Sequence, residues 1–125
     1  MTIRDLEPKL IWEQFDDITR VPRPSKKEEK IIAWLIDFAK KHGLWYRQDE
    51  MGNVIIRKPA TSGRENDKGI IIQGHLDMVA VKEPDSNHDF GKDPLELVVD
   101  GDYLYAKGTS LGGDDGIAVA YALAL

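Results

Sequence analysis

Apolar residues recur at helical spacing near the start of the chain. Residues 6–20 carry them three or four positions apart, and Pro8 suits the first turn of a helix. The next four residues, Val21–Pro24, contain two prolines, and each disfavours helical backbone at the residue before it. The pattern therefore predicts a helix over residues 6–20 that ends at this junction. Its apolar stripe consists of Ile11, Trp12, Phe15 and Ile18.

A second helix is predicted directly after the junction. Ser25 and Glu28 have the spacing of a capping box, in which a hydroxyl and a carboxylate each satisfy a free amide of the first helical turn. The helix is expected to extend to about Lys41, and Gly43 suits its C-terminal cap. Its apolar stripe consists of Ile31, Ile32, Trp34, Leu35 and Phe38.

Strand-like segments follow the second helix. Residues 44–48 and 53–58 flank a turn-rich stretch and predict a β-hairpin. Residues 69–74 form a short apolar run, which is typical of a strand buried on both faces in a largely parallel sheet. Residues 95–106 predict another pair of strands, with Asp100-Gly101 at the turn. Together these elements predict an α/β fold with a mixed, largely parallel sheet flanked by helices.

The last segment, residues 117–125, contains no charged residue and is expected to begin a helix. A helix that is apolar on all sides is usually a buried one. This one lacks the glycine, asparagine or basic residue that commonly marks a helix end. We therefore expect residues 1–125 to be the N-terminal portion of a longer chain. The alternative is a small protein whose last helix is covered by a partner subunit.

Composition narrows the classes of function. The 125 residues include 17 basic and 22 acidic ones, and the net charge of −5 argues against a nucleic-acid-binding module. The absence of cysteine excludes disulfides, iron–sulfur clusters and thiolate zinc sites, so a metal would need histidine and carboxylate ligands. Of the three histidines, His42 and His88 are interpreted as structural. Without a secretory signal or a long apolar run, a soluble cytoplasmic protein with no membrane contact is expected.

His75 and Asp77 directly follow the apolar run of residues 69–74. In an extended segment, residues two positions apart point to the same side, and functional residues of open α/β sheets gather at strand ends. A neutral imidazole is a good zinc ligand, and a nearby carboxylate often accepts its other N–H. The alternative interpretation is a structural hydrogen bond, because the tripeptide H-x-D alone has low specificity.

A glycine-rich loop, residues 108–116, carries the adjacent acids Asp114 and Asp115 at the start of the last predicted helix. One interpretation is a hard oxygen ligand presented to a divalent metal. The other is structural, because acids at a helix start are favoured by the helix dipole by up to about 1 kcal/mol and glycines form turns. The ligand spacing of a calcium-binding EF-hand is absent.

Taken together, the two motifs resemble those of the co-catalytic zinc exopeptidases and deacylases of the aminoacylase/glutamate carboxypeptidase/peptidase T superfamily. In that superfamily an apolar strand leads into H-x-D, and a glycine-rich loop with D-[DN] opens a helix. Closer still is the aminoacyl-histidine dipeptidase branch, also called peptidase D or cytosol non-specific dipeptidase. That likeness extends from about Leu10 to the last residue. The segments that carry it are 21–25, 56–61, 74–79, 88–90, 92–94 and 108–116.

The resemblance implies roles for individual residues. His75 would be a ligand of one zinc ion, Asp114 would bridge two zinc ions, and Asp77 would be a catalytic-site residue that orients His75. Asp115 would be structural, and the peptide bond between the two acids would be cis. Gly116 stands where many relatives have lysine, as it does in the aminoacyl-histidine branch. The implied cofactor is Zn²⁺, two ions per site, with Co²⁺ or Mn²⁺ as replacements. The implied substrates are unblocked dipeptides, including those that end in histidine, and the full-length enzyme would be a homodimer.

The resemblance also implies that residues 1–125 are the N-terminal portion of a metallopeptidase catalytic domain. In the relatives a pair of glutamates that includes the general base, a further carboxylate ligand and a C-terminal histidine come later in the chain, as does any dimerisation domain. Since two ligands cannot hold two zinc ions, we expect these residues alone to be inactive. The alternatives are an N-acyl amino acid deacylase or carboxypeptidase of the same superfamily, and a non-catalytic remnant that acts as a binding module. The loop of residues 81–94 favours the dipeptidase branch.

Overall fold

A computed structural model describes all of the chain, residues 1–125, as two compact units. One unit comprises residues 1–31 and 73–125, and the other comprises residues 32–72. The secondary structure is a 3₁₀ turn, three helices and four strands: η1 (Ile3–Asp5), α1 (Lys9–Thr19), α2 (Glu29–Lys41), β1 (Trp45–Gln48), β2 (Val54–Arg57), β3 (Leu97–Asp100), β4 (Tyr103–Ala106) and α3 (Gly113–Ala124). None of the helices has the length and apolar character required to span a membrane.

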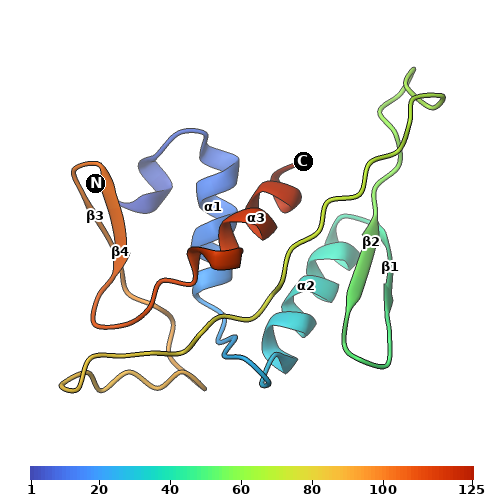
Figure 1. Ribbon diagram of the computed structural model, residues 1–125. Coiled ribbons are helices and arrows are strands. Elements are labelled where there is room, and N and C mark those ends of the chain that lie inside the picture. Colours follow the sequence, from blue (N-terminus) through green and yellow to red (C-terminus); the bar gives the residue numbers. More distant parts are fainter. The chain divides into compact units, whose positions relative to one another are not determined.

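The core of the first unit lies where α1 packs against α3 (Figure 1). Phe15 and Ile18, two members of the predicted α1 stripe, are each only 1% exposed. Asp16 on the same helix is buried, and its carboxylate accepts hydrogen bonds from Arg4 at 2.6 Å and from Arg20 at 3.0 Å. These ion pairs connect the η1 turn to α1 and satisfy a charge that would otherwise be costly to bury.

The second hairpin of the chain, β3–β4, confirms the sequence prediction. The strands are antiparallel, with Leu97 opposite Ala106 and Asp100 opposite Tyr103. Gly101 has a φ of +58°, which a residue without a side chain adopts at little cost, and so closes the tight turn.

In the second unit, β1 and β2 form the other predicted antiparallel hairpin, with Trp45 opposite Arg57. Gly52 in its turn lies against α2, since a Cβ there would be 3.3 Å from the Ile32 side chain. The α2 helix ends at Lys41, as predicted, and Gly43 follows with a φ of +63°, after which the Leu44 amide donates back to the Ala39 carbonyl.

The predicted parallel sheet is wrong. Both sheets are two-stranded and antiparallel, and residues 69–74 form no strand, so Figure 1 draws them without an arrow. Ile70 and Ile71 are 80% and 96% exposed. A strand requires a neighbour that pairs with its amides and carbonyls, and no segment of the described chain provides one here. The single parallel pairing is an isolated bridge between Pro24 and Met78.

Two further local predictions need correction. Ser25 does not cap α2, which begins at Glu29, because the Ser25 hydroxyl is directed to Asp77 and to the Met78 carbonyl instead. The last helix starts earlier than expected, at Gly113, and contains non-helical backbone at its two acids. It is also less buried than its composition suggests, since Tyr121 is 56% exposed.

Candidate active site

The structure brings His75 and Asp114 together although they lie far apart in the sequence. His75 Nε2 is 3.0 Å from Asp114 Oδ1. The His75 side chain is 52% exposed and that of Asp114 is 95% exposed, so both side chains are accessible to solvent. Asp114 lies in the non-helical start of α3, and the peptide bond to Asp115 is cis, as the resemblance implied.

Asp77 fixes the orientation of the His75 ring. His75 Nδ1 is 2.9 Å from Asp77 Oδ1 and 3.1 Å from the Asp77 carbonyl, while the Ser25 hydroxyl donates to Asp77 Oδ2 at 2.5 Å. An acceptor at Nδ1 favours the tautomer with its proton on that nitrogen and leaves the Nε2 lone pair facing Asp114. In that tautomer Nε2 and the carboxylate are both electron-pair donors, so a proton or a metal cation is needed between them.

The electrostatics of the site agree with this arrangement. The hydrogen bond with Asp114 is the largest cause that raises the pKa of the His75 imidazole; burial opposes the rise, and the contacts with Asp77 add to it. The hydrogen bond from Ser25 lowers the pKa of the Asp77 carboxyl, and His75 contributes to this lowering. Asp77 is therefore held as an acceptor for the imidazole N–H.

Asp115 is directed away from the gap between His75 and Asp114. Its Oδ2 accepts the backbone amide of His75 at 3.2 Å. The approach is close, because a Cβ on Gly74 would lie 2.9 Å from the same oxygen. Asp115 thus connects the start of α3 to the backbone of the His75 segment (residues 74–78), which is a structural contact.

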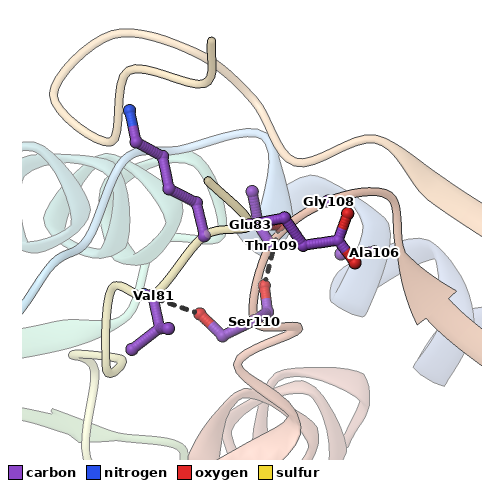
Figure 2. Close-up of a pocket in the computed structure, with 7 residues that line it drawn as sticks. Val81, Glu83, Ala106, Gly108, Thr109 and Ser110 are labelled. Atoms are coloured by element: carbon purple, nitrogen blue, oxygen red, sulfur yellow. Dashed lines mark hydrogen bonds between the residues drawn. The ribbon is translucent and has the colours of Figure 1, made fainter. Parts of the chain in front are cut away.

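The loop after the His75 segment pairs with the glycine-rich loop. Lys82 and Thr109 form an antiparallel bridge, and the Ser110 amide donates to the Val81 carbonyl at 2.8 Å. Figure 2 shows the Ser110 side chain directed toward Val81, whose amide donates to the Ser110 hydroxyl at 3.2 Å. A shallow pocket of about 240 Å³ lies along this pairing. It is lined by Val81, Lys82, Glu83, Ala106, Gly108, Thr109 and Ser110.

Arg23 also connects the two loops, a role that the sequence analysis did not assign. It lies between α1 and α2 and is 2% exposed. Its guanidinium donates to the Leu76 carbonyl at 3.1 Å and to the Gly112 carbonyl at 2.8 Å. The available signal was an arginine between two prolines, followed by Ser25, in the break between two predicted helices.

The other two histidines lie outside this arrangement. His88 packs against Phe90, with ring centroids 4.6 Å apart, and its carbonyl accepts a hydrogen bond from Lys82. His42 Nδ1 is 2.9 Å from the Phe38 carbonyl at the end of α2.

The donor atoms fit zinc in chemical type, because imidazole nitrogen and carboxylate oxygen are both common zinc ligands. Their number is too small for a zinc site, which has three or four protein ligands. No group of three or more histidine, cysteine, aspartate or glutamate side chains in the structure is arranged to hold a metal ion. His75 and Asp114 could therefore provide two ligands of a larger set.

Comparisons of the sequence and the structure with known proteins identify relatives of this chain. A scan against models of protein families found no match. Over 123 residues, 98% of this chain, it is 44% identical to the cytosol non-specific dipeptidase of Escherichia coli (strain K12) and covers 25% of that protein. The crystal structure of aminoacylhistidine dipeptidase from Vibrio alginolyticus superposes with a TM-score of 0.96 at 45% identity, over 99% of this chain and 25% of the other. This chain is similar to aminoacyl-histidine dipeptidases.

A crystal structure of a tripeptidase from Staphylococcus aureus matches with a TM-score of 0.67 at 19% identity, over 92% of this chain and 30% of the other. At that identity the likeness concerns the fold alone. The chain spans about a quarter of the length of the two closer relatives. The predicted resemblance to aminoacyl-histidine dipeptidases is confirmed, and both of these relatives are named as dipeptidases, which hydrolyse peptide bonds.

Proposed function

We propose that the full-length gene product is a metal-dependent dipeptidase of broad specificity that accepts dipeptides ending in histidine. The observation that carries this proposal is the placement of His75 Nε2 opposite Asp114 Oδ1 with Nδ1 already engaged by Asp77. The identity of 44–45% to two dipeptidases supports the same reaction class. A location in the cytosol, as in the name of the Escherichia coli relative, and a homodimeric assembly are part of the proposal.

In this proposal His75 and Asp114 are metal ligands and Asp77 is the residue that orients the imidazole. A bound divalent ion, with Zn²⁺ first and Co²⁺ or Mn²⁺ as replacements, would polarise the scissile carbonyl and lower the pKa of a water molecule. Asp77 keeps the His75 ring in one tautomer and one orientation, which makes Nε2 available as a ligand. Ser25 in turn fixes the Asp77 carboxylate through its second oxygen.

Metal removal tests the proposal. Treatment of the full-length protein with a chelator should abolish hydrolysis of unblocked dipeptides, and added zinc should restore it, because in this proposal the bound ion lowers the pKa of the attacking water. The measurement is the rate of dipeptide hydrolysis, compared with that of an N-acetyl amino acid. Hydrolysis that persists in metal-free protein would contradict the proposal. Faster cleavage of the N-acetyl substrate would identify a deacylase instead. If the zinc-loaded protein cleaves neither substrate, it is a non-catalytic binding module.

The 125-residue polypeptide on its own should not hydrolyse dipeptides, even with zinc added. The reason is that His75 and Asp114 supply two ligands, whereas a zinc site that activates water has three protein ligands. The measurement is product formation from an Xaa-His dipeptide, with the full-length protein under the same conditions as the positive control. Turnover by the polypeptide that disappears on His75→Ala substitution would show that these residues form a complete site.

A further inference from the structure

Arg23 is a buried cation whose hydrogen bonds go to backbone carbonyls. The side chain is 2% exposed, and its Nη1 donates to the Leu76 carbonyl at 3.1 Å while its Nη2 donates to the Gly112 carbonyl at 2.8 Å. Leu76 follows His75 directly, and Gly112 lies two residues before Asp114. A single rigid guanidinium thus joins the backbone beside each of the two proposed ligands.

The space for this guanidinium depends on two glycines. A Cβ on Gly112 would overlap Arg23 Nη2, and a Cβ on Gly116 would lie 2.8 Å from the same atom and 3.2 Å from the Phe15 ring. The glycine-rich sequence of the loop therefore has a steric reason beyond turn formation. Gly116 has to lack a side chain for Arg23 to reach the loop.

The environment of Arg23 is expensive for a charge. Its Nε has no hydrogen-bond partner, and burial lowers its pKa to about 10, although the charge of Asp77 opposes this shift. An apolar side chain would avoid that desolvation cost. An apolar side chain could not donate hydrogen bonds to the Leu76 and Gly112 carbonyls. The hydrogen bonds of the guanidinium therefore distinguish Arg23 from an apolar residue at this position.

Apart from the Arg23 guanidinium, the contacts of residues 23–25 reach only the His75 side of the site. The Met78 amide donates to the Arg23 carbonyl and the Ser25 amide donates to the Met78 carbonyl, so the backbone of residues 23–25 is attached to the His75 segment. The Ser25 side chain also reaches only that segment, through Asp77 and the Met78 carbonyl. The side chain of Arg23 is the part of residues 23–25 that extends to the glycine-rich loop.

We propose that Arg23 is a positioning residue, which rests on the proposed function in that it sets the separation of His75 and Asp114 for metal binding. Its fork of donors fixes the backbone on both sides of the gap, next to the contact of the Asp115 carboxylate with the His75 amide, and the spacing of the two ligands depends on it. Positioning partners of metal ligands are worth about 10–100-fold in metal affinity.

The test uses the full-length protein with Arg23→Met and Arg23→Lys, and with Arg4→Met as the matched control. Arg4 also forms two hydrogen bonds, but to Asp16 and Asp17 on α1, away from the site. Zinc dissociation constants, measured by competition with a chelating dye, should rise at least 10-fold for Arg23→Met and less for Arg23→Lys. Arg4→Met should leave zinc binding unchanged even where its melting temperature falls.

Crystal structures of the metal-free proteins provide a second readout. In Arg23→Met the distance from His75 Nε2 to Asp114 Oδ1, 3.0 Å in the parent, should exceed hydrogen-bond range. If that distance is retained, or if both Arg23 variants bind zinc like Arg4→Met, the proposal is overturned. If the parent protein binds no zinc, the proposed function fails, and the distance still decides the role of Arg23. Should Arg23→Met not fold, Arg23→Lys gives the same two measurements.

Discussion

Replacement of His75 by alanine should abolish zinc binding at this site and dipeptide hydrolysis by the full-length protein. The substitution removes the imidazole that lies 3.0 Å from Asp114, whose carboxylate is 95% exposed. Loss of a metal centre removes several kcal/mol of transition-state stabilisation, so kcat/KM should fall by about a thousand-fold or more. The measurements are zinc content by elemental analysis and the rate of hydrolysis of an Xaa-His dipeptide.

His42→Ala is the matched control for that substitution. His42 is also an exposed histidine, but its ring faces the Phe38 carbonyl at the end of α2. We expect this variant to retain zinc and full activity, because surface substitutions away from special features usually change stability by less than about 0.5 kcal/mol. A His75→Ala protein with normal zinc content and rate would refute the ligand role of the imidazole.

The site could be found from the sequence where its chemistry is local. His75 and Asp77 are two positions apart, and the ring nitrogen does lie 2.9 Å from the carboxylate. The pairing with Asp114 was expected from the resemblance to zinc exopeptidases, since no local pattern relates residues so distant in the chain. The metal itself and the roles of these three side chains remain predictions.

Arg23 and Ser25 could not be assigned from the sequence for a physical reason. Both act through contacts that span more than fifty residues, to Leu76 and to Asp77. Ser25 also has a local alternative, the capping of α2, that the sequence pattern favours and the fold does not use. A hydroxyl can satisfy either partner, and only the tertiary structure decides between them.

The elements of the fold that depend on local sequence could be predicted, and the pairing of distant segments could not. Helices α1 and α2 and both hairpins depend on spacing, prolines and turn glycines, which are local, and all four are present. The parallel sheet was not predictable from residues 69–74, because an apolar run does not determine whether a second segment pairs with it. Ile71, at 96% exposed, has the composition of a buried strand without the neighbour that would bury it.

The glycine-rich loop provides the second prediction with a large expected effect, Gly112→Ala. Gly112 has a φ of +73°, which costs a residue with a side chain about 1–2 kcal/mol. Its new Cβ would also overlap the Arg23 guanidinium and lie 3.0 Å from the Met78 sulfur, and overpacking of this kind costs about 1–3 kcal/mol. Together these effects should lower the free energy of unfolding by roughly 2–5 kcal/mol.

Gly113→Ala, one position along, where φ is not positive and no Arg23 atom is near, tests for a general intolerance of the loop to a side chain. A Cβ there meets nothing closer than the Leu111 side chain at 3.8 Å, so stability should change by less than about 0.5 kcal/mol. Chemical denaturation of the metal-free proteins gives both free energies without any contribution from bound zinc. Equal stability of the two variants would mean that the loop moves aside easily, and the close packing of Gly112 on Arg23 would then have no energetic importance.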